Sequence, residues 1–179
     1  MVRRIITIDG ENDKSYALAD EDLQSPLLDL ARPGFFRQKI WMTDSSPAKI
    51  QDVSWVDAAP ELLEPLAGGS IFHIHQFPPD KIWRENINPR KIAEYFKSSN
   101  AEHLIHQSEG AHPYMQKTDT LDLCVILKGS ITLILDTTEV DLHEGDSIVQ
   151  RATRHAWSNR SLENCTIAIS SHCAKQESV

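Results

Sequence analysis

The stretch TDTLDLCVILKGSITLILD, Thr118–Asp136, decides the fold class of this chain. Its first half places the polar residues Thr118, Thr120 and Asp122 two positions apart, and Gln116 precedes them with the same spacing. Side chains two apart on an extended strand point to the same side. The second half is almost entirely aliphatic and β-branched, as buried strands are. The stretch therefore predicts paired strands with a polar ladder on one face.

The pattern of short strands continues to the C-terminus. Runs rich in Val, Ile, Leu and Thr follow one another from about residue 119 onward, separated by Gly, Asp, Asn or Glu. Further strands are expected at 3–8, 15–20, 37–44 and 68–77. Strands at this spacing without helices between them are typical of an antiparallel sandwich or barrel. The sequence predicts an all-β fold.

One helix interrupts the strands. Pro89 suits a first helical turn, Asn88 suits the cap before it, and Ile92, Tyr95 and Phe96 follow helical spacing. The insertion either braces an open side of the barrel or covers its mouth, and its ordinary apolar stripe favours the brace. We expect one domain, residues 1–179, with N-terminal strands and loops at about 1–80, the helical insertion at about 81–100 and the core motifs at about 112–172.

Composition narrows the classes of partner. The 179 residues are 40% hydrophobic and carry a formal net charge of -8. This charge, with scattered Lys and Arg, disfavours nucleic acid, and no apolar run is long enough to span a membrane. The three cysteines have no metal-site spacing, so reduced thiols are expected. We expect a soluble, cytoplasmic protein whose partner is a small organic molecule.

Two spaced motifs carry a resemblance to a known family. Asp122 is followed by Gly129, and GDSIVQRATRHAWSN, Gly145–Asn159, then brings His155 with Asn159 four positions later. This arrangement resembles the two signature motifs of the cupin superfamily, which implies a jelly-roll β-barrel with the one inserted helix. Asp122 would stand at the position of the family's Glu. His155 and Asn159 would stand at the His and Asn of its second motif.

The resemblance is incomplete at the metal-binding residues. The HxH histidines of the first cupin motif are absent, and Met115 and Lys117, or Gln116 and Thr118, take their places. More narrowly, TDTLD and VQRATRHAWSN look like a subgroup of single-domain cupins that carry TDTxD and VQRGTxHAWxN. The expectation is a cupin with a degenerate metal site.

The remaining residues permit two kinds of chemistry. A divalent transition metal would have Asp122, His155 and Gln116 as ligands, which is a weak set. We therefore expect that the protein has no cofactor, and we keep a bound metal as the alternative. Without a metal, His155 would be the acid-base group and Asp122 would orient its ring and favour the imidazolium form. Substrate contacts are expected from Gln116, Thr118, Thr120, Gln150, Trp157 and Asn159.

Other histidines offer competing explanations. His73 and His75 lie two apart on an expected strand and could supply the missing HxH, but we expect that strand on the outer or dimer-facing sheet. His103, His106 and His112 lie in a polar loop, where solvated side chains are expected, although His112 could reach the cavity mouth.

The leading hypothesis is a lyase or isomerase that moves a proton in an isomerisation, cyclisation, dehydration or decarboxylation in secondary or aromatic metabolism. The alternatives are a metal-dependent dioxygenase and a non-catalytic small-molecule-binding cupin, in which the inward polar residues are a retained hydrogen-bonded core network. A homodimer is expected, because edge strands of short barrels gain cover by pairing.

Overall fold

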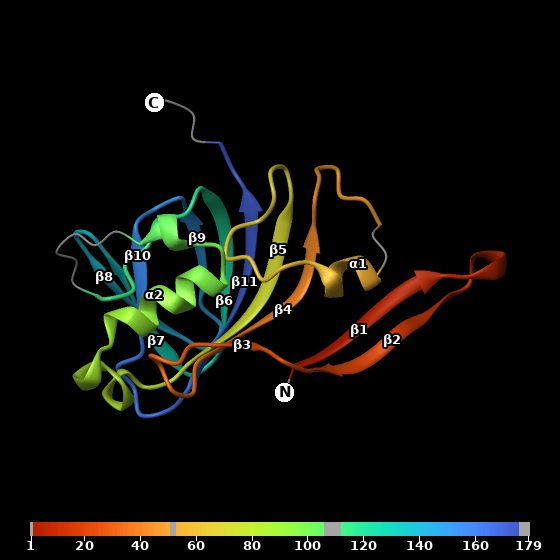
Figure 1. The fold of residues 1–179 in the computed structure, drawn as a ribbon. Helices are drawn as coiled ribbons and strands as arrows, with labels where there is room; N and C mark the ends of the chain where they lie inside the picture. Colours follow the sequence, from red (N-terminus) through yellow and green to blue (C-terminus); the bar gives the residue numbers. More distant parts are fainter. Residues whose placement is uncertain (1, 51–52, 106–111, 176–179) are drawn as a thin grey trace.

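Antiparallel strands dominate the computed structural model, which describes residues 2–50, 53–105 and 112–175. Two α-helices, α1 and α2, lie among eleven strands (Figure 1). The elements are β1 (Val2–Asp9), β2 (Ser15–Leu23), β3 (Leu27–Leu28), β4 (Phe36–Thr43), α1 (Val53–Ala58), β5 (Ser70–Phe77), α2 (Pro89–Ser98), β6 (Thr120–Lys128), β7 (Ser130–Leu135), β8 (Glu139–His143), β9 (Ser147–Arg151), β10 (His155–Ser158) and β11 (Cys165–Cys173).

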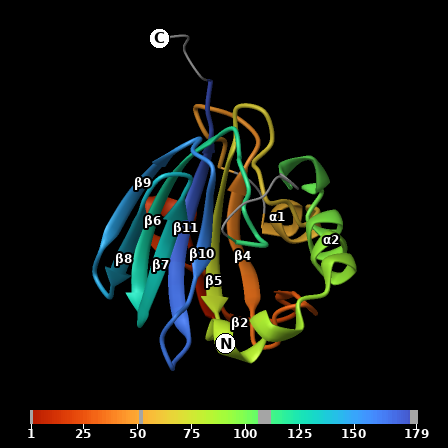
Figure 2. The ribbon, with the colours of Figure 1, turned by 90° about the vertical axis from the view of Figure 1, so that its left-hand side faces the viewer.

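Two sheets build the barrel. The larger has the strand order β3-β4-β5-β11-β6-β9 and the smaller has the order β10-β7-β8. Figure 2 shows the small sheet facing the β11, β6 and β9 side of the large one, with α1 and α2 beyond β4. In β6, the buried Thr120, Asp122, Cys124 and Ile126 alternate with more exposed neighbours. The polar ladder of the sequence therefore faces the barrel interior, as its two-residue period predicts.

The strand-like run at residues 147–157 divides between the two sheets. β9 pairs with β6 in the large sheet, whereas β10 pairs with β7 in the small sheet. The crossing is made at Ala152, which has a left-handed φ of 51° and donates its backbone N–H to the Thr120 carbonyl. This crossing places Gln150 and His155 on facing walls of the barrel, although only five positions separate them.

Helix α2 closes the side of the barrel next to β4 and β5. Asn88 caps it by accepting hydrogen bonds from the backbone N–H groups of Arg90 and Lys91, as the sequence predicts. Ile92, Tyr95 and Phe96 are buried in the main core cluster. The helix therefore acts as a brace, and Tyr95 and Phe96 also form part of the cavity wall described below.

The N-terminal hairpin stands apart from the barrel. β1 and β2 pair only with each other among the described strands, and Figure 1 shows them extending away from the large sheet. A salt bridge from Arg4 to Asp57 of α1, 2.9 Å long, ties the hairpin back. Among the strands expected in the first half, those at 37–44 and 68–77 join the barrel as β4 and β5, and the first two do not.

The predicted fold class, an all-β cupin-type barrel with an inserted helix, is confirmed. The short helix α1 was not foreseen; its Val56 packs against Met42 and Ile71 in a separate small core. Within the described residues, no helix has the length and apolar character needed to cross a membrane.

Candidate functional site

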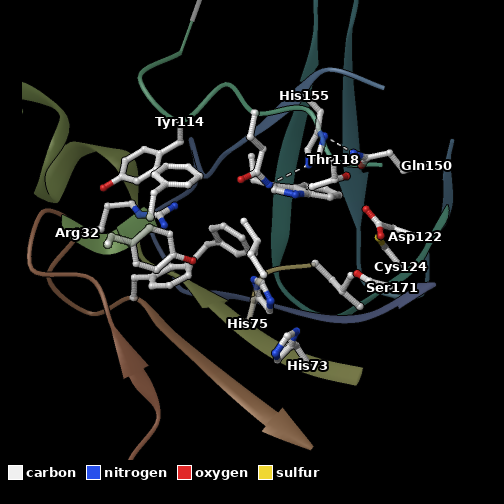
Figure 3. A pocket seen from close by; sticks show the side chains of 18 residues that line it. Arg32, His73, His75, Tyr114, Thr118, Asp122, Cys124, Gln150, His155 and Ser171 are labelled. Carbon is white, nitrogen blue, oxygen red and sulfur yellow. Dashed lines mark hydrogen bonds between the residues drawn. The ribbon is translucent and has the colours of Figure 1, made fainter. Parts of the chain in front are cut away.

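A cavity lies between the two sheets, at the side that α2 closes (Figure 3). The space within it that admits the centre of a water molecule is about 50 Å³. Aromatic and aliphatic side chains form much of its wall, and polar side chains gather on two parts of it. The polar and thiol residues that line it are Arg32, His73, His75, Tyr114, Gln116, Thr118, Asp122, Cys124, Gln150, His155 and Ser171.

Gln116 and His155 are held side by side by the backbone. The two residues exchange N–H···O=C hydrogen bonds of 2.9 Å each, which extend the small sheet beyond β10. Their side chains also meet, with 3.2 Å between the Gln116 amide nitrogen and His155 Nε2. On the other side of the ring, the Gln150 amide contacts Nδ1. His155 therefore sits between two amide side chains, and Figure 3 shows Gln150 beside its ring.

The hydrogen bonds of His155 bear on its tautomer. Its Nδ1 lies 2.9 Å from the Thr153 carbonyl oxygen, which can only accept. A proton on Nδ1 satisfies the Thr153 carbonyl and leaves Nε2 to accept from the Gln116 N–H, whereas the Gln150 amide nitrogen, itself a donor, is satisfied only by an unprotonated Nδ1. Burial lowers the pKa of His155, opposed by the hydrogen bond to Thr153 and by the charge of Asp122. Asp122 thus favours the imidazolium form, as expected, but burial is the larger effect and holds the pKa of the ring below its usual value.

Asp122 does not orient the His155 ring. Its side chain is 6% exposed, and its Oδ1 has no hydrogen-bond partner among the described residues. In the large sheet it lies between Gln150 of β9 and Ser171 of β11. The predicted roles are therefore wrong in one respect: the Thr153 carbonyl holds the ring, and the carboxylate faces the cavity.

Of the other residues predicted to contact the substrate, two line the cavity, one supports a lining residue and one, Asn159, lies elsewhere. Thr118 and Trp157 line the cavity, and the Trp157 ring meets the His155 ring edge-on with centroids 6.1 Å apart. Thr120 is buried but does not line the cavity; it donates to the Thr118 hydroxyl at 2.7 Å. Thr120 therefore orients Thr118.

Asn159 also lies outside the cavity wall, and the expected substrate contact is wrong there. Its Nδ2 donates to the carbonyls of Phe77 and Glu163, at 2.9 and 2.8 Å. Its Oδ1 accepts from the backbone N–H and the hydroxyl of Ser161, at 3.0 and 2.7 Å. Asn159 braces the loop between β10 and β11 against the end of β5.

His73 and His75 line the same cavity, so the expectation that they face outward is wrong. They are 1% and 7% exposed, and neither Nε2 has a hydrogen-bond partner among the described residues. Burial lowers the pKa of both rings well below the usual value, helped by the positive charge of Arg37. Two neutral imidazoles therefore face the cavity from β5. The parity of Ile71, His73, His75 and Phe77 in SIFHIHQF was the signal that could have placed them.

The remaining loop histidines differ from one another. His112 is buried, and burial lowers its pKa to about 3, so the 3.9 Å separation from Asp80 is not an ion pair at neutral pH. The expectation of a solvated ring is wrong for His112 and holds for His103, which is exposed beside Glu64. His106 lies outside the described residues.

Sequence reasoning missed a cluster at the other end of the cavity. The Arg32 guanidinium lies between the rings of Phe35 and Tyr114, and its Nε donates to Asp29 at 2.7 Å. Tyr114 donates its hydroxyl to the same carboxylate at 2.6 Å. Tyr114 is 85 positions from Asp29 in the chain, so no local pattern could have revealed the pair.

The arrangement does not fit the metal site that the cupin resemblance implies. Among the described residues, no group of three or more His, Cys, Asp or Glu side chains is placed to hold a metal ion. Of the expected ligands, Gln116 turns its amide nitrogen, a donor, towards His155, whose Nε2 it occupies. Cys124 is a poor ligand, because burial raises its pKa to about 12. We therefore derive no step through a metal.

Comparisons with known proteins give partial matches. No protein-family model matches the chain. Fifty-nine residues are 45% identical to the Phomopsin biosynthesis cluster proteins C' and D of Diaporthe leptostromiformis, covering 32% of this chain and 31% of each of those proteins. Eighty residues are 34% identical to the cupin-domain-containing oxidoreductase srdD of Neurospora crassa, covering 41% of each chain. The match thus spans less than half the length of these curated relatives.

A solved structure is similar over most of the chain. The Cnp3 cupin domain of Schizosaccharomyces pombe covers 96% of this chain and 87% of its own, with a TM-score of 0.45 and 9% identity. The chain has a cupin-type barrel fold.

Proposed function

We propose that this chain is a cupin-superfamily protein that transfers a proton on a small organic molecule, as a lyase or isomerase, and that Asp122 is the base. The observation that carries the proposal is the buried Asp122 carboxylate with an unpaired Oδ1 on the cavity wall. A carboxylate that nothing in the described protein neutralises is costly to bury. A substrate C–H or O–H proton provides the partner that the carboxylate lacks.

The groups around Asp122 can stabilise the negative charge that the substrate carries after it has lost its proton. Removal of a proton beside a carbonyl places negative charge on the carbonyl oxygen, which hydrogen-bond donors then stabilise. The Gln116 amide, beside the small sheet, and the Ser171 hydroxyl, on the large sheet, carry N–H and O–H groups that line the same cavity. Asp122, now a carboxylic acid, exchanges its proton with solvent and protonates another atom of the substrate, so the isomerisation begins and ends with the same enzyme state and the product carries a solvent hydrogen.

His155 takes a positioning role in this scheme. Both ring nitrogens are engaged, Nδ1 with Thr153 and Nε2 with Gln116. A neutral ring held in this way fixes the direction of the Gln116 amide. We therefore assign the proton transfer to Asp122 and the support of the amide wall to His155, with Trp157 as an apolar face for the substrate.

A role in secondary metabolism is supported by the names of two relatives. The Diaporthe proteins are named for a phomopsin biosynthesis cluster, and the match to them covers about a third of this chain. The substrate would then be an intermediate of a biosynthetic pathway in the cells that naturally make this protein.

The test is turnover of a small-molecule extract of those cells in D₂O, followed by mass spectrometry. The intact protein should generate products that carry solvent deuterium, with equal yield in air and under anaerobic conditions. Asp122→Asn should abolish them, whereas Asp22→Asn, at an exposed carboxylate on the hairpin, should not. Deuterated products that persist in Asp122→Asn would contradict the assignment of the base.

The same assay separates the competing functions. The Neurospora relative is named an oxidoreductase, the broad class that includes dioxygenases. A metal-dependent dioxygenase requires O₂ and adds oxygen to its product. A non-catalytic binder retains a compound from the extract and releases it unchanged. Turnover only in air, or binding without any new product, would replace the proton-transfer proposal with one of these two.

We also propose a homodimer, built on the outer face of the large sheet. Phe72 of β5, Leu123 of β6 and Val149 of β9 are 37%, 45% and 64% exposed and lie in one row across that face, with Ser170 of β11 between Phe72 and Leu123. Exposed apolar patches of this kind mark association surfaces. Analytical ultracentrifugation should find a dimer that Leu123→Glu/Val149→Lys converts to a monomer. Val140→Glu, at a 42% exposed position on β8, is the matched control. A monomeric unaltered protein would contradict the proposal.

A further inference from the structure

Arg32 is held rigidly at one end of the cavity. Its side chain is 5% exposed, and its Nε donates to Asp29 Oδ2. Asp29 is itself fixed, because its Oδ1 accepts from the backbone N–H of Ala31 at 2.8 Å. The centre of the guanidinium lies 3.9 Å from the Phe35 ring centroid and 3.7 Å from the Tyr114 ring centroid. The plane and direction of the guanidinium are therefore set by its surroundings.

Asp29, Phe35 and Tyr114 together clamp the Arg32 side chain. This clamp leaves the two terminal nitrogens of Arg32 for a ligand. Only Nε makes a hydrogen bond to the described residues, and Nη1 and Nη2 have no acceptor there. Arg32 nevertheless lines the cavity, next to Tyr114. A guanidinium offers parallel N–H groups that match the two oxygens of a carboxylate. An arginine that is clamped at Nε and open at its terminal nitrogens is prepared for such a pair.

The electrostatics of this end also favour an anion. Arg37 is fully buried, and the carboxylate nearest to it, that of Glu61, is 3.8 Å away. Both Arg37 and Arg32 lower the pKa of His75, although burial is the larger cause. Asp29 balances one of the two guanidinium charges and already accepts three hydrogen bonds, from Ala31, Arg32 and Tyr114. The cavity wall near His75 is thus under a net positive field.

We propose that Arg32 binds the carboxylate of a small organic acid whose apolar or aromatic body lies along the cavity towards Asp122. This inference rests on the proposed function, in which the cavity is the substrate site. Figure 3 shows Arg32 and Asp122 at opposite ends of the group of lining side chains, with aromatic rings between them. A carboxylate anchored at Arg32 leaves the far end of the molecule for proton transfer. A single accessible guanidinium between two rings suits a flat monoanion better than a phosphate, which needs more donors.

The test compares acid and amide probes of equal shape. Cinnamate and cinnamamide, and benzoate and benzamide, differ only in the group that Arg32 would bind. Isothermal titration calorimetry on the full chain should give affinities at least about tenfold higher for the acids, as a charge-assisted bidentate pair supplies. The preference should weaken as salt rises.

Variants then assign the preference to Arg32. Arg32→Gln alone would strand the buried Asp29, so the paired variant Asp29→Asn/Arg32→Gln keeps the clamp neutral and should bind acids and amides alike. Arg32→Lys retains charge without the fork and should keep part of the preference. Arg90→Gln, at an exposed position on α2, should behave as the unaltered protein. Circular dichroism of each variant verifies the fold.

Several outcomes would overturn the inference. Equal binding of acid and amide, binding of neither in both pairs, or a preference that survives in the paired variant each contradict it. The two proposals fail separately. Asp122→Asn should lose turnover and retain the acid preference. Turnover that persists without an acid preference removes only the role of Arg32, and an acid preference without turnover removes only the proton transfer.

Discussion

Replacing Asn159 by Ala tests whether this residue is a brace for the fold or a contact for the ligand. The side chain is 1% exposed and takes part in four hydrogen bonds, two donated and two accepted. A buried hydrogen bond contributes about 1 kcal/mol, and a stranded partner adds a penalty of similar size. The variant removes the side-chain donor to the Phe77 carbonyl and one of the two donors to the Glu163 carbonyl, which keeps the Ser161 hydroxyl at 3.0 Å. We expect the free energy of unfolding to fall by about 3–5 kcal/mol, a large share of the about 5–15 kcal/mol typical of a domain.

Urea unfolding followed by tryptophan fluorescence measures this loss. Ser161→Ala removes the hydroxyl that bonds to Asn159 Oδ1 and keeps the backbone bond, so it should cost about 1 kcal/mol. At a temperature where both variants are folded, the acid preference of the cavity should equal that of the unaltered protein. A fall of less than about 1 kcal/mol for Asn159→Ala, or a loss of acid binding by the folded variant, would refute the reasoning.

Three further substitutions follow from the buried polar groups and the turns. Asp122→Asn should raise the free energy of unfolding by about 1 kcal/mol while turnover is lost, because an amide costs less to bury than a carboxyl group whose Oδ1 lacks a partner; a lower urea midpoint would contradict the unpaired state of Oδ1. His112 has a folded-state pKa of about 3 against 6.5 unfolded, so its contribution is complete above pH 6.5 and falls by about 1.4 kcal/mol per pH unit below it. His112→Asn should flatten the pH dependence of the urea midpoint between pH 7 and 5, and an unchanged slope argues otherwise. Gly129→Ala should cost more than Gly145→Ala, since both have positive φ but only at Gly129 would Cβ lie 2.8 Å from a carbonyl, that of Asn164; equal losses in unfolding free energy would show that this contact is harmless.

Local signals in the sequence were sufficient where neighbours in the chain determine the structure. The inward face of β6 follows from the spacing of Thr120, Asp122 and Cys124, and the start of α2 follows from Asn88 and Pro89. Each of these depends on residues within a few positions of one another. The polar ladder could therefore be placed before any long-range contact was known.

The composition of the site depended on contacts that have no local signal. In SIFHIHQF, the large side chains of Phe72 and Ile74 on the opposite face weakened the signal that the parity of Ile71, His73, His75 and Phe77 gives. His73 and His75 were placed wrongly for this reason. His155 was expected to pair with Asp122, but the crossing at Ala152 turns β10 into the other sheet and gives the ring Thr153 and Gln116 instead.

The unpaired polar atoms of the cavity argue for a ligand over a retained core network. A network that only stabilises the fold bonds to itself, as His155 does with Gln116 and with the Thr153 carbonyl. Yet Asp122 Oδ1, Gln150 Oε1 and the Nε2 atoms of His73 and His75 lack partners among the described residues, and all four side chains line one cavity. Each stranded buried group costs about 1–3 kcal/mol, which an apolar substitution would recover. A chain that keeps four such groups around one cavity keeps them because solvent or a ligand forms hydrogen bonds with them there. The open nitrogens of Arg32 identify that ligand as an acid.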